Sequence, residues 1–397
     1  MYDEKGGITG SNVGERTLTA VTGRRILDSH LGWTFEFEVV LDDRSVGRGS
    51  APRGETPSVY EQPATRTFEG LLDAARSQLL GRSFTQESFD EAAAALGKRW
   101  GTGAVLAMSI AYHNAASQEA REIAPQAIPR LMLNLLNGGL HAYTNPVASD
   151  FTEVLLLPRE NALEPAIEAY LHLLEIVPHE LRKGEEMLVG GNRVFRLGED
   201  PNHAVLEFVR SLLERERLAE MFGIVVDASA GDWVNDDGYR LPVTGRSMTR
   251  EQAVRWWLSL VANHELAMVE DPLAEQDVPG WEELHALRPP DCAILGDNYT
   301  STSPDRLLSE GRAGHLDGVL VKPNQNGTVS GSLAFAGAAR DRGLLTIASH
   351  RSIETESTFL IDFALRTGSD AIKIGPFRDF TAVVKFNELL RRLPDAP

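Results

Sequence analysis

Chemically active side chains follow a series of short apolar runs in the C-terminal two thirds of the sequence. They are acids first and mainly bases later: Asp227, Glu270, Asp297, Lys322, Ser349-His350-Arg351-Ser352 and Lys373. One charged residue after a strand is ordinary, because the end of a strand meets water. Six successive strand ends of this kind indicate a site, since parallel barrels build their active sites at the C-terminal rim.

The acidic members of this set predict a metal site. Three carboxylates that converge on one point repel one another unless a cation neutralises them. Mg²⁺ prefers carboxylate and substrate oxygens as ligands. We therefore expect Asp227, Glu270 and Asp297 to bind Mg²⁺, and the sequence has no Cys and His cluster with zinc spacing.

The bases favour proton abstraction next to a carboxylate. Removal of such a proton produces an enediolate, which nearby positive charge must stabilise. Lys322 is the predicted base, with a pKa lowered by Mg²⁺ and by Lys373, while Lys373 and Arg351 hold anionic groups of the substrate. The alternative for Lys322 is a surface salt bridge, which its position after a buried run disfavours.

The apolar runs define the elements that must position these residues. Short runs separated by amphipathic helical stretches are typical of a parallel sheet buried on both faces, at 154–157, 223–226, 266–269, 293–295, 318–321, 345–348 and 371–372. This periodicity suits a barrel or a doubly wound open sheet equally.

The N-terminal part has a different pattern. Residues 34–41 alternate as a half-buried strand, and residues 66–123 have helical periodicity. Two prolines interrupt 123–129, so we place a boundary there, between an α+β domain at 1–126 and a barrel domain at 127–397.

Composition narrows the class of protein. The chain has 397 residues, is 42% hydrophobic and carries a formal net charge of −18 with its basic residues dispersed, which argues against a nucleic-acid partner. Any anionic substrate therefore needs a local concentration of positive charge. Cys292 is the single cysteine, and no apolar stretch of signal-peptide or membrane-span length is present, so we expect a cytoplasmic protein.

Several motifs resemble those of the enolase family, from about residue 18 to 393. They are Ile26-Leu27-Asp28-Ser29 with Thr34-Phe35-Glu36, Asn137-Gly138-Gly139-Leu140-His141-Ala142, Val269-Glu270-Asp271-Pro272, Lys322-Pro323-Asn324-Gln325-Asn326-Gly327-Thr328, Ser349-His350-Arg351-Ser352-Ile353-Glu354 and Lys385-Phe386-Asn387-Glu388. The resemblance implies an enolase-like (β/α)8 barrel with an N-terminal α+β capping domain, an irregular start to the barrel, Mg²⁺ dependence and a homodimer.

The resemblance also implies roles for single residues. Asp227, Glu270 and Asp297 match metal ligands, and Lys322 matches the base. The remaining matches are contacts to the substrate, with Lys373 on its carboxylate, Arg351 and Ser352 on its phosphate, and His141 and His350 elsewhere on it. Glu153 matches the first of two catalytic glutamates.

Departures from the family pattern surround the substrate. Asn192 stands where the second glutamate protonates the leaving hydroxyl, and Glu199 replaces that acid only if the loop is rebuilt. Thr56 stands opposite a metal-binding serine in a loop that also carries Arg53, and extra residues before Glu153 make Asp150 its rival. Arg53 and Arg193 are candidates to bind an added carboxylate.

The positions of the base and the metal ligands match the family pattern, whereas the position of the general acid and the loop with Thr56 do not. This combination predicts an Mg²⁺-dependent carbon–oxygen lyase (hydro-lyase) that acts on a modified substrate, a small phosphorylated or phosphonylated carboxylate. The resemblance suggests a carboxyphosphonoenolpyruvate synthase of phosphonate antibiotic biosynthesis. The alternatives are an ordinary phosphopyruvate hydratase and a non-catalytic protein that kept the scaffold.

Overall fold

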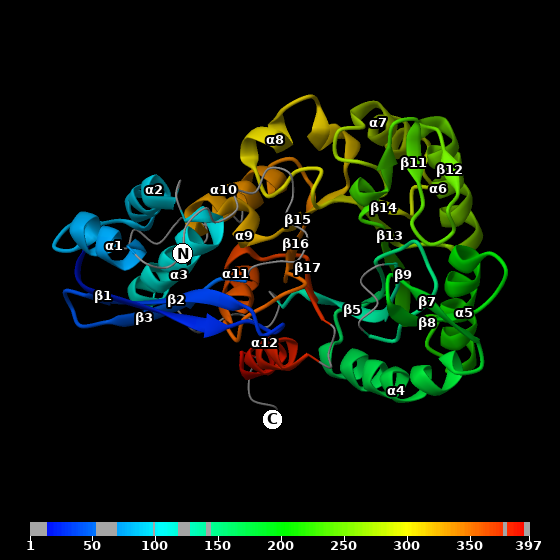
Figure 1. Cartoon of the computed structure of the whole chain (residues 1–397), viewed down its shortest axis with the longest axis horizontal. Coiled ribbons are helices and arrows are strands. Elements are labelled where there is room, and N and C mark those ends of the chain that lie inside the picture. The colour runs from blue at the N-terminus through cyan, green and yellow to red at the C-terminus, as the bar shows by residue number, and fades with distance from the viewer. Residues whose placement is uncertain are drawn as a thin grey trace.

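The computed structural model describes residues 14–52, 70–97, 100–117, 128–139, 144–375 and 379–392. Its N-terminal part pairs a sheet of strand order β3-β2-β1-β4 with helices (Figure 1). The strands are β1 (Arg16–Leu27), β2 (Trp33–Leu41), β3 (Val46–Ser50) and β4 (Ser83–Phe84). The helices are α1 (Leu71–Leu79), α2 (Gln86–Gly97) and α3 (Gly101–Ala116). We call this part the capping domain.

The rest of the chain forms a closed barrel of strand order β13-β14-β15-β16-β17-β5-β6-β9. The strands are β5 (Arg130–Asn137), β6 (Glu153–Pro158), β9 (Phe222–Asp227), β13 (Met268–Glu270), β14 (Ala293–Gly296), β15 (Gly318–Val321), β16 (Leu345–Ser349) and β17 (Ala371–Ile374). All neighbours are parallel except β6, which is antiparallel to both β5 and β9. The predicted barrel with a capping domain is confirmed, and the choice between a barrel and an open sheet is settled.

Helices and small hairpins connect the barrel strands. The helices are α4 (Leu163–Leu181), α5 (Pro201–Arg215), α6 (Arg250–His264), α7 (Val278–Leu287), α8 (Pro304–Leu308), α9 (Pro323–Asn326), α10 (Val329–Arg340), α11 (Phe359–Thr367) and α12 (Phe380–Arg391). One hairpin joins β7 (Glu185–Val189) to β8 (Asn192–Arg196), and a small sheet contains β10 (Val234–Asn235), β11 (Gly238–Arg240) and β12 (Ser247–Met248). Short 3₁₀ helices cover Ala230–Trp233 and Arg312–His315.

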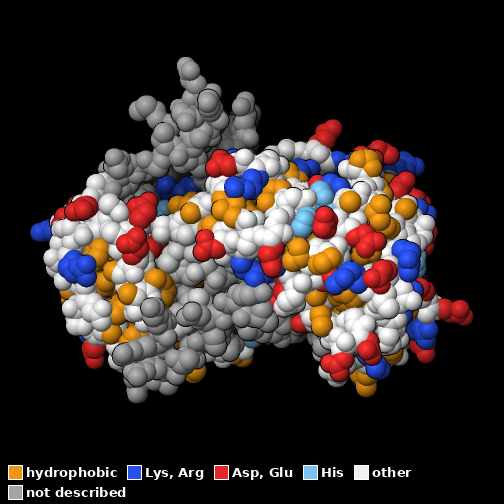
Figure 2. Space-filling model, turned by 90° about the horizontal axis from the view of Figure 1, so that it is seen from above, with side chains coloured by type: hydrophobic (Ala, Val, Ile, Leu, Met, Phe, Trp, Pro, Cys, Tyr) orange, Lys and Arg blue, Asp and Glu red, His pale blue; other side chains and the backbone are white. Residues whose placement is uncertain are grey.

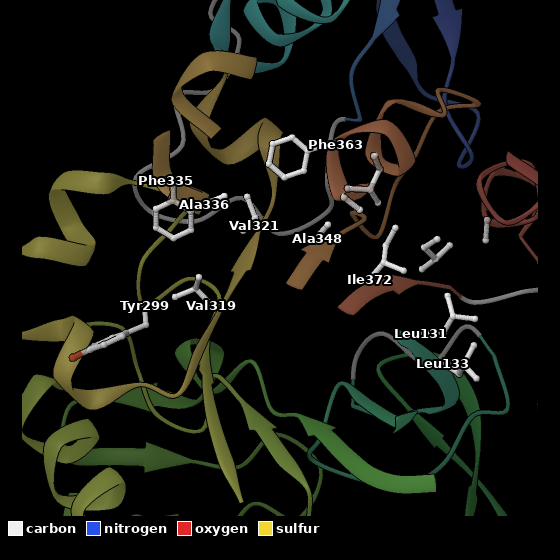
Figure 3. Close-up of a cluster of buried hydrophobic side chains, with 14 of the residues drawn as sticks. Leu131, Leu133, Tyr299, Val319, Val321, Phe335, Ala336, Ala348, Phe363 and Ile372 are labelled. Carbon is white, nitrogen blue, oxygen red and sulfur yellow. The ribbon is translucent and has the colours of Figure 1, made fainter. Parts of the chain in front are cut away.

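The barrel has two apolar layers, because successive side chains of a strand point to opposite faces. One layer fills the interior with Met132, Leu155, Leu157, Val225, Met268, Leu295, Leu320, Ile347 and Ala371. The alternate residues face the surrounding helices. In Figure 3, Val319 and Val321 of β15 lie near Phe335 of α10, and Ala348 of β16 lies near Phe363 of α11. Full burial of such a side chain contributes about 1.5–3 kcal/mol.

Two elements differ from the sequence prediction. Strand β5 was absent from the predicted runs because Asn134 interrupts its apolar pattern, and the hairpin β7–β8 was not predicted. The boundary between residues 126 and 127 stays a prediction, because it lies outside the described residues. None of the helices in the described ranges is long and apolar enough to cross a membrane. Acidic and basic side chains are interspersed over the coloured face in Figure 2.

Candidate active site

The side chains at the barrel mouth continue the interior layer. Asp227, Glu270 and Asp297 each lie two positions beyond an interior apolar residue of their own strand. Lys322 and Lys373 have the same spacing on β15 and β17. Because side chains two residues apart share a face, all five are directed toward the barrel axis at one end. The alternation that fills the interior therefore also gathers the site.

Glu153 reaches the same end because β6 runs in the opposite direction. It is the first residue of β6, and its register partner on β9 is Asp227, the last residue of that strand. A glutamate at the beginning of an antiparallel strand thus joins residues at the ends of parallel strands. The Oε1 atom of Glu153 accepts a 2.6 Å hydrogen bond from the Asn134 side-chain amide of β5.

Lys373 lies at the centre of the acidic cluster and is only 2% exposed. Its Nζ is 2.8 Å from Glu153 Oε2, 2.7 Å from Asp227 Oδ2 and 2.7 Å from Glu270 Oε2. Burial alone would lower the pKa of Lys373, but the three carboxylates outweigh it and raise that pKa well above its usual value. Lys373 is therefore a permanent cation at the mouth.

Lys322 pairs with the third predicted metal ligand. Its Nζ lies 2.5 Å from Asp297 Oδ2, and Gln325 donates to Asp297 Oδ1 at 3.0 Å. Thr302 fixes this arrangement, because its hydroxyl accepts from the Lys322 backbone N–H at 3.0 Å and donates to Gln325 Oε1 at 2.7 Å. The orientation of the Gln325 amide is thereby set with its NH₂ group toward Asp297.

The carboxylates of the cluster differ in their protonation. Burial, followed by the charge of Asp227, raises the pKa of Glu270 well above its usual value. Burial and the charge of Asp297 do the same for Asp271, which accepts the Asp297 backbone N–H. Burial opposes ionisation of Glu153 as well, but Lys373 lowers its pKa below the usual value. Burial and neighbouring carboxylates thus favour the neutral forms of Glu270 and Asp271, whereas Lys373 favours the ionised form of Glu153.

The donor chemistry of the cluster fits a divalent cation. Four buried carboxylates contact the two lysines, namely Glu153, Asp227, Glu270 and Asp297. Glu270 Oε1 is buried and has no hydrogen-bond partner among the residues that the structure describes, and carboxylate oxygens suit Mg²⁺. As the described residues are arranged, however, no three His, Cys, Asp or Glu side chains form a group that could hold a metal. The ammonium groups of Lys322 and Lys373 lie against the predicted ligands instead and supply the neutralising charge.

The predicted phosphate contacts lie after β16, on a neighbouring part of the mouth. Arg351 is 6% exposed, and its guanidinium donates to Asn324 Oδ1 at 3.1 Å. Burial lowers the pKa of His350 to about 3, so this imidazole is neutral at ordinary pH. Ser352 lies next to Arg351 and is exposed.

Asp150, the rival of Glu153, is engaged in a structural clamp. Its carboxylate accepts hydrogen bonds from the Val243 N–H at 2.6 Å, from the Thr244 N–H at 3.1 Å and hydroxyl at 2.8 Å, and from the Asn202 amide at 2.7 Å. With these partners Asp150 fixes the segment before β6, whereas Glu153 contacts Lys373. The arrangement favours Glu153 for a role in chemistry.

The hairpin β7–β8 carries the altered acid position. Asn192 follows the Gly190-Gly191 turn as the first residue of β8, and Phe195 of the same strand bridges to Val147. Arg193 does not face the mouth as the added-carboxylate hypothesis requires. Its side chain is 78% exposed and pairs with Glu186 across the hairpin at 2.9 Å. Glu199 is exposed in the segment before α5.

Three predicted site residues, His141, Arg53 and Thr56, lie outside the described residues. Conversely, the sequence analysis assigned no role to Asn134 or Gln325, whose amides donate to Glu153 and Asp297. The period-two spacing could have found Asn134, which lies two positions beyond the interior residue Met132. Gln325 lies in the short helix α9, where the period-two spacing of strands carries no signal.

Fold and site together define an α/β-barrel protein with a lysine and carboxylate centre at the barrel mouth. Residues 125–395 match the family model for the enolase C-terminal TIM barrel domain. The chain is also 31% identical over 410 residues to a protein named enolase from Acidothermus cellulolyticus, and the match covers 94% of this chain and 93% of that relative. The chain belongs to the enolase family and is an enolase-like lyase.

Proposed function

We propose that the chain is a hydro-lyase that removes the α-proton of a 2-phosphoglycerate-like carboxylate and eliminates water to give a phosphoenolpyruvate-like enol. The observation that carries this proposal is the position of two lysines on one carboxylate cluster at the barrel mouth. Lys373, whose pKa is raised by three carboxylates, is suited to hold the substrate carboxylate. Lys322 remains as the base.

The proposed reaction has two steps. In the first, Lys322 Nζ takes the proton from the carbon next to the carboxylate, and the C–H electron pair moves into the carboxylate to form an enediolate. In the second, the enediolate electrons form the C=C bond and restore the carboxylate while the C–O bond of the neighbouring carbon breaks, and the leaving hydroxide takes a proton from solvent to become water. The rate of this second step depends on the pKa of the group that donates the proton to the leaving oxygen.

The first step requires a neutral Lys322, so its ion pair with Asp297 must open. We propose that Asp227, Glu270 and Asp297 would hold Mg²⁺ when it is bound, with Thr56 as a further candidate ligand. Bound Mg²⁺ would supply the positive charge that stabilises an enediolate. Gln325 keeps Asp297 in place while its lysine partner leaves.

The modified substrate is proposed from the residues around the leaving group. Asn192 can donate a hydrogen bond to the leaving oxygen but cannot protonate it, a deficit of roughly 10²–10⁴ in rate for the ordinary reaction. Arg53 adds a cation in the family's loop, where it would bind an extra acidic group. A substrate with a carboxyphosphonate in place of the phosphate, as in carboxyphosphonoenolpyruvate synthesis for phosphonate antibiotics, has an extra carboxylate that suits the added cation.

Turnover of two substrates tests this choice. The chain with Mg²⁺ is given 2-phosphoglycerate or its carboxyphosphonate counterpart, and the conjugated enol product is followed by absorbance. We expect kcat/KM to be higher for the carboxyphosphonate by at least about tenfold. Equal or faster turnover of 2-phosphoglycerate would instead identify an ordinary phosphopyruvate hydratase.

A further inference from the structure

A second cavity lies away from the barrel mouth, between the start of α5, strand β12 and helix α6. Its volume is about 450 Å³, within the range of small-molecule sites. Its polar lining consists of His203, Arg246, Ser247, Gln252, Arg255 and Ser259. No Asp or Glu is among the described residues that line it, although the whole chain has a formal net charge of −18.

The two guanidinium groups of this cavity are available to a ligand. Within the described part of the chain, neither Arg246 nor Arg255 forms an ion pair, whereas Arg250 on the same helix pairs with Asp277. Glu251, one helical turn before Arg255, accepts a hydrogen bond from Thr249. Arginine recognises phosphate oxygens through parallel N–H donors, so two unpaired arginines over one cavity favour an anion of that type.

A histidine pair adds a further polar group. His203 Nδ1 lies 2.9 Å from His264 Nε2, which leaves the other ring nitrogen of His203 outside this contact. His264 is 5% exposed, and its Nδ1 has no hydrogen-bond partner among the described residues. The pair can therefore adjust its protons when an anion approaches His203, because each ring has one nitrogen free of the mutual contact.

The cavity adjoins the clamp on Asp150. Asn202, which hydrogen-bonds Asp150, precedes His203 in the chain. Thr244, whose N–H and hydroxyl both bind Asp150, lies two residues before Arg246. A ligand that bridges α5 and the β11–β12 connection thus restrains both sides of the clamp. The clamp in turn fixes the segment that leads into Glu153.

We propose that this cavity binds the phosphate group of a small phosphorylated molecule, and that its occupation tightens the Asp150 clamp. The arginines neutralise the phosphate, while Ser247, Gln252 and Ser259 contribute neutral hydrogen bonds. The cavity size fits a phosphate monoester, and the position makes it a site separate from the predicted phosphate contacts at Arg351 and Ser352. This binding does not depend on the identity of the lyase substrate.

Calorimetric titration of the full chain with inorganic phosphate, at chloride-matched ionic strength, tests the binding. We expect the variant R246Q/R255Q to lose one binding component, with that affinity reduced at least about tenfold. Arg250→Gln is the matched control, because Arg250 lies on the same helix as Arg255 but its guanidinium pairs with Asp277. This variant should keep the phosphate-binding component that R246Q/R255Q loses. Unchanged phosphate binding by R246Q/R255Q overturns the proposal.

Hydrogen exchange of the unmutated chain locates the phosphate without any variant. We expect phosphate to slow amide exchange in residues 198–210 and 243–259, which include the Val243 and Thr244 amides of the clamp. In R246Q/R255Q this protection should be absent, while its unfolding temperature without phosphate shows that the variant is folded. Protection confined to residues 349–353 would assign the phosphate to the barrel mouth and overturn the proposal.

Discussion

At the level of single side chains, the clearest departure from the family pattern among the described residues is Asn192, which stands where the family has a second catalytic glutamate. It occupies the first position of β8, directly after a glycine turn. An amide there can hydrogen-bond a leaving oxygen but has no proton of suitable acidity to transfer. The chemistry of one side chain thus distinguishes an ordinary hydratase from an enzyme with an altered second step.

We predict that Asn192→Glu increases the turnover of 2-phosphoglycerate, by up to roughly 10² to 10⁴, because it restores a general acid. Steady-state kinetics with Mg²⁺ measure the effect. Arg193→Glu is the control, since the neighbouring side chain is exposed and directed toward Glu186, and it should give no increase. If Asn192→Glu is no faster than the unmutated chain, Asn192 does not face the leaving oxygen.

Residue types after the strands predicted most of this cluster, because a strand end fixes where its side chain lies. They could not predict which charges pair. Lys373 contacts carboxylates from β6, β9 and β13, and these meet only because the barrel closes β17 against β5 and β5 against β6. The pairing of Arg193 with Glu186 likewise required the hairpin, which the sequence analysis did not predict.

At the scale of elements, period-two alternation explains both the barrel interior and the site. In the sequence, seven of the barrel strands were recognised as short apolar runs, but the eighth, β5, is interrupted by Asn134, whose amide donates to Glu153. Alternation also carries no information on strand direction. The family resemblance implied only an irregular start to the barrel, and the antiparallel register of β6 now accounts for the position of Glu153.

The contact between β3 and α3 is another property of elements. A Cβ on Gly49 would lie 2.3 Å from the Ala107 carbonyl oxygen, and one on Gly47 would lie 2.1 Å from that of Ala111. Real Cβ atoms do not approach backbone this closely, so the glycines let the strand lie directly on the helix. This packing supports the capping domain.

We predict that Gly49→Ala lowers the free energy of unfolding by about 1–3 kcal/mol, because the helix must move away from the strand. Denaturant titration measures this change. Gly337→Ala in α10 is the control, since its added Cβ would have no atom within 4 Å. That variant should be neutral or more stable by up to about 1 kcal/mol. Equal stabilities of the two variants would contradict the close approach.

At the scale of the whole molecule, the capping domain is attached to the barrel by buried polar contacts. Asp90 of α2 accepts the Ser330 N–H of α10 at 2.8 Å, and Ser109 of α3 accepts the Val329 N–H at 2.9 Å. His113 of α3 packs edge to face against Phe359 of α11, with ring centroids 5.7 Å apart. These contacts join segments more than two hundred residues apart, which local sequence patterns do not predict.

The buried His113 makes stability depend on pH. Burial, with a smaller effect of the Arg366 charge, lowers the pKa of His113 from its usual value of 6.5 to about 3. Between these values the unfolded chain binds a proton that the folded chain does not, so stability falls as pH drops from 6.5 toward 3. His350, with a pKa also near 3, acts in the same direction.

We predict that His113→Phe makes the decline of unfolding free energy below pH 6.5 shallower, by up to about 1.4 kcal/mol per pH unit. Denaturant titrations between pH 6.5 and 4 measure the slope. The control is His179→Phe, which replaces an exposed histidine of α4 and should leave the slope as it was. A slope unchanged in His113→Phe would mean that His113 is protonated in the folded chain.

The central claim is that Lys322 removes a proton from the α-carbon at the barrel mouth. Exchange of that proton in 2-phosphoglycerate with deuterium from solvent, followed by NMR in the presence of Mg²⁺, measures this step even if elimination is slow. We expect exchange with the unmutated chain and with Lys183→Ala, which alters a surface lysine paired with Glu180. Lys322→Ala should abolish it. Absence of exchange in the unmutated chain, or undiminished exchange in Lys322→Ala, would contradict the account.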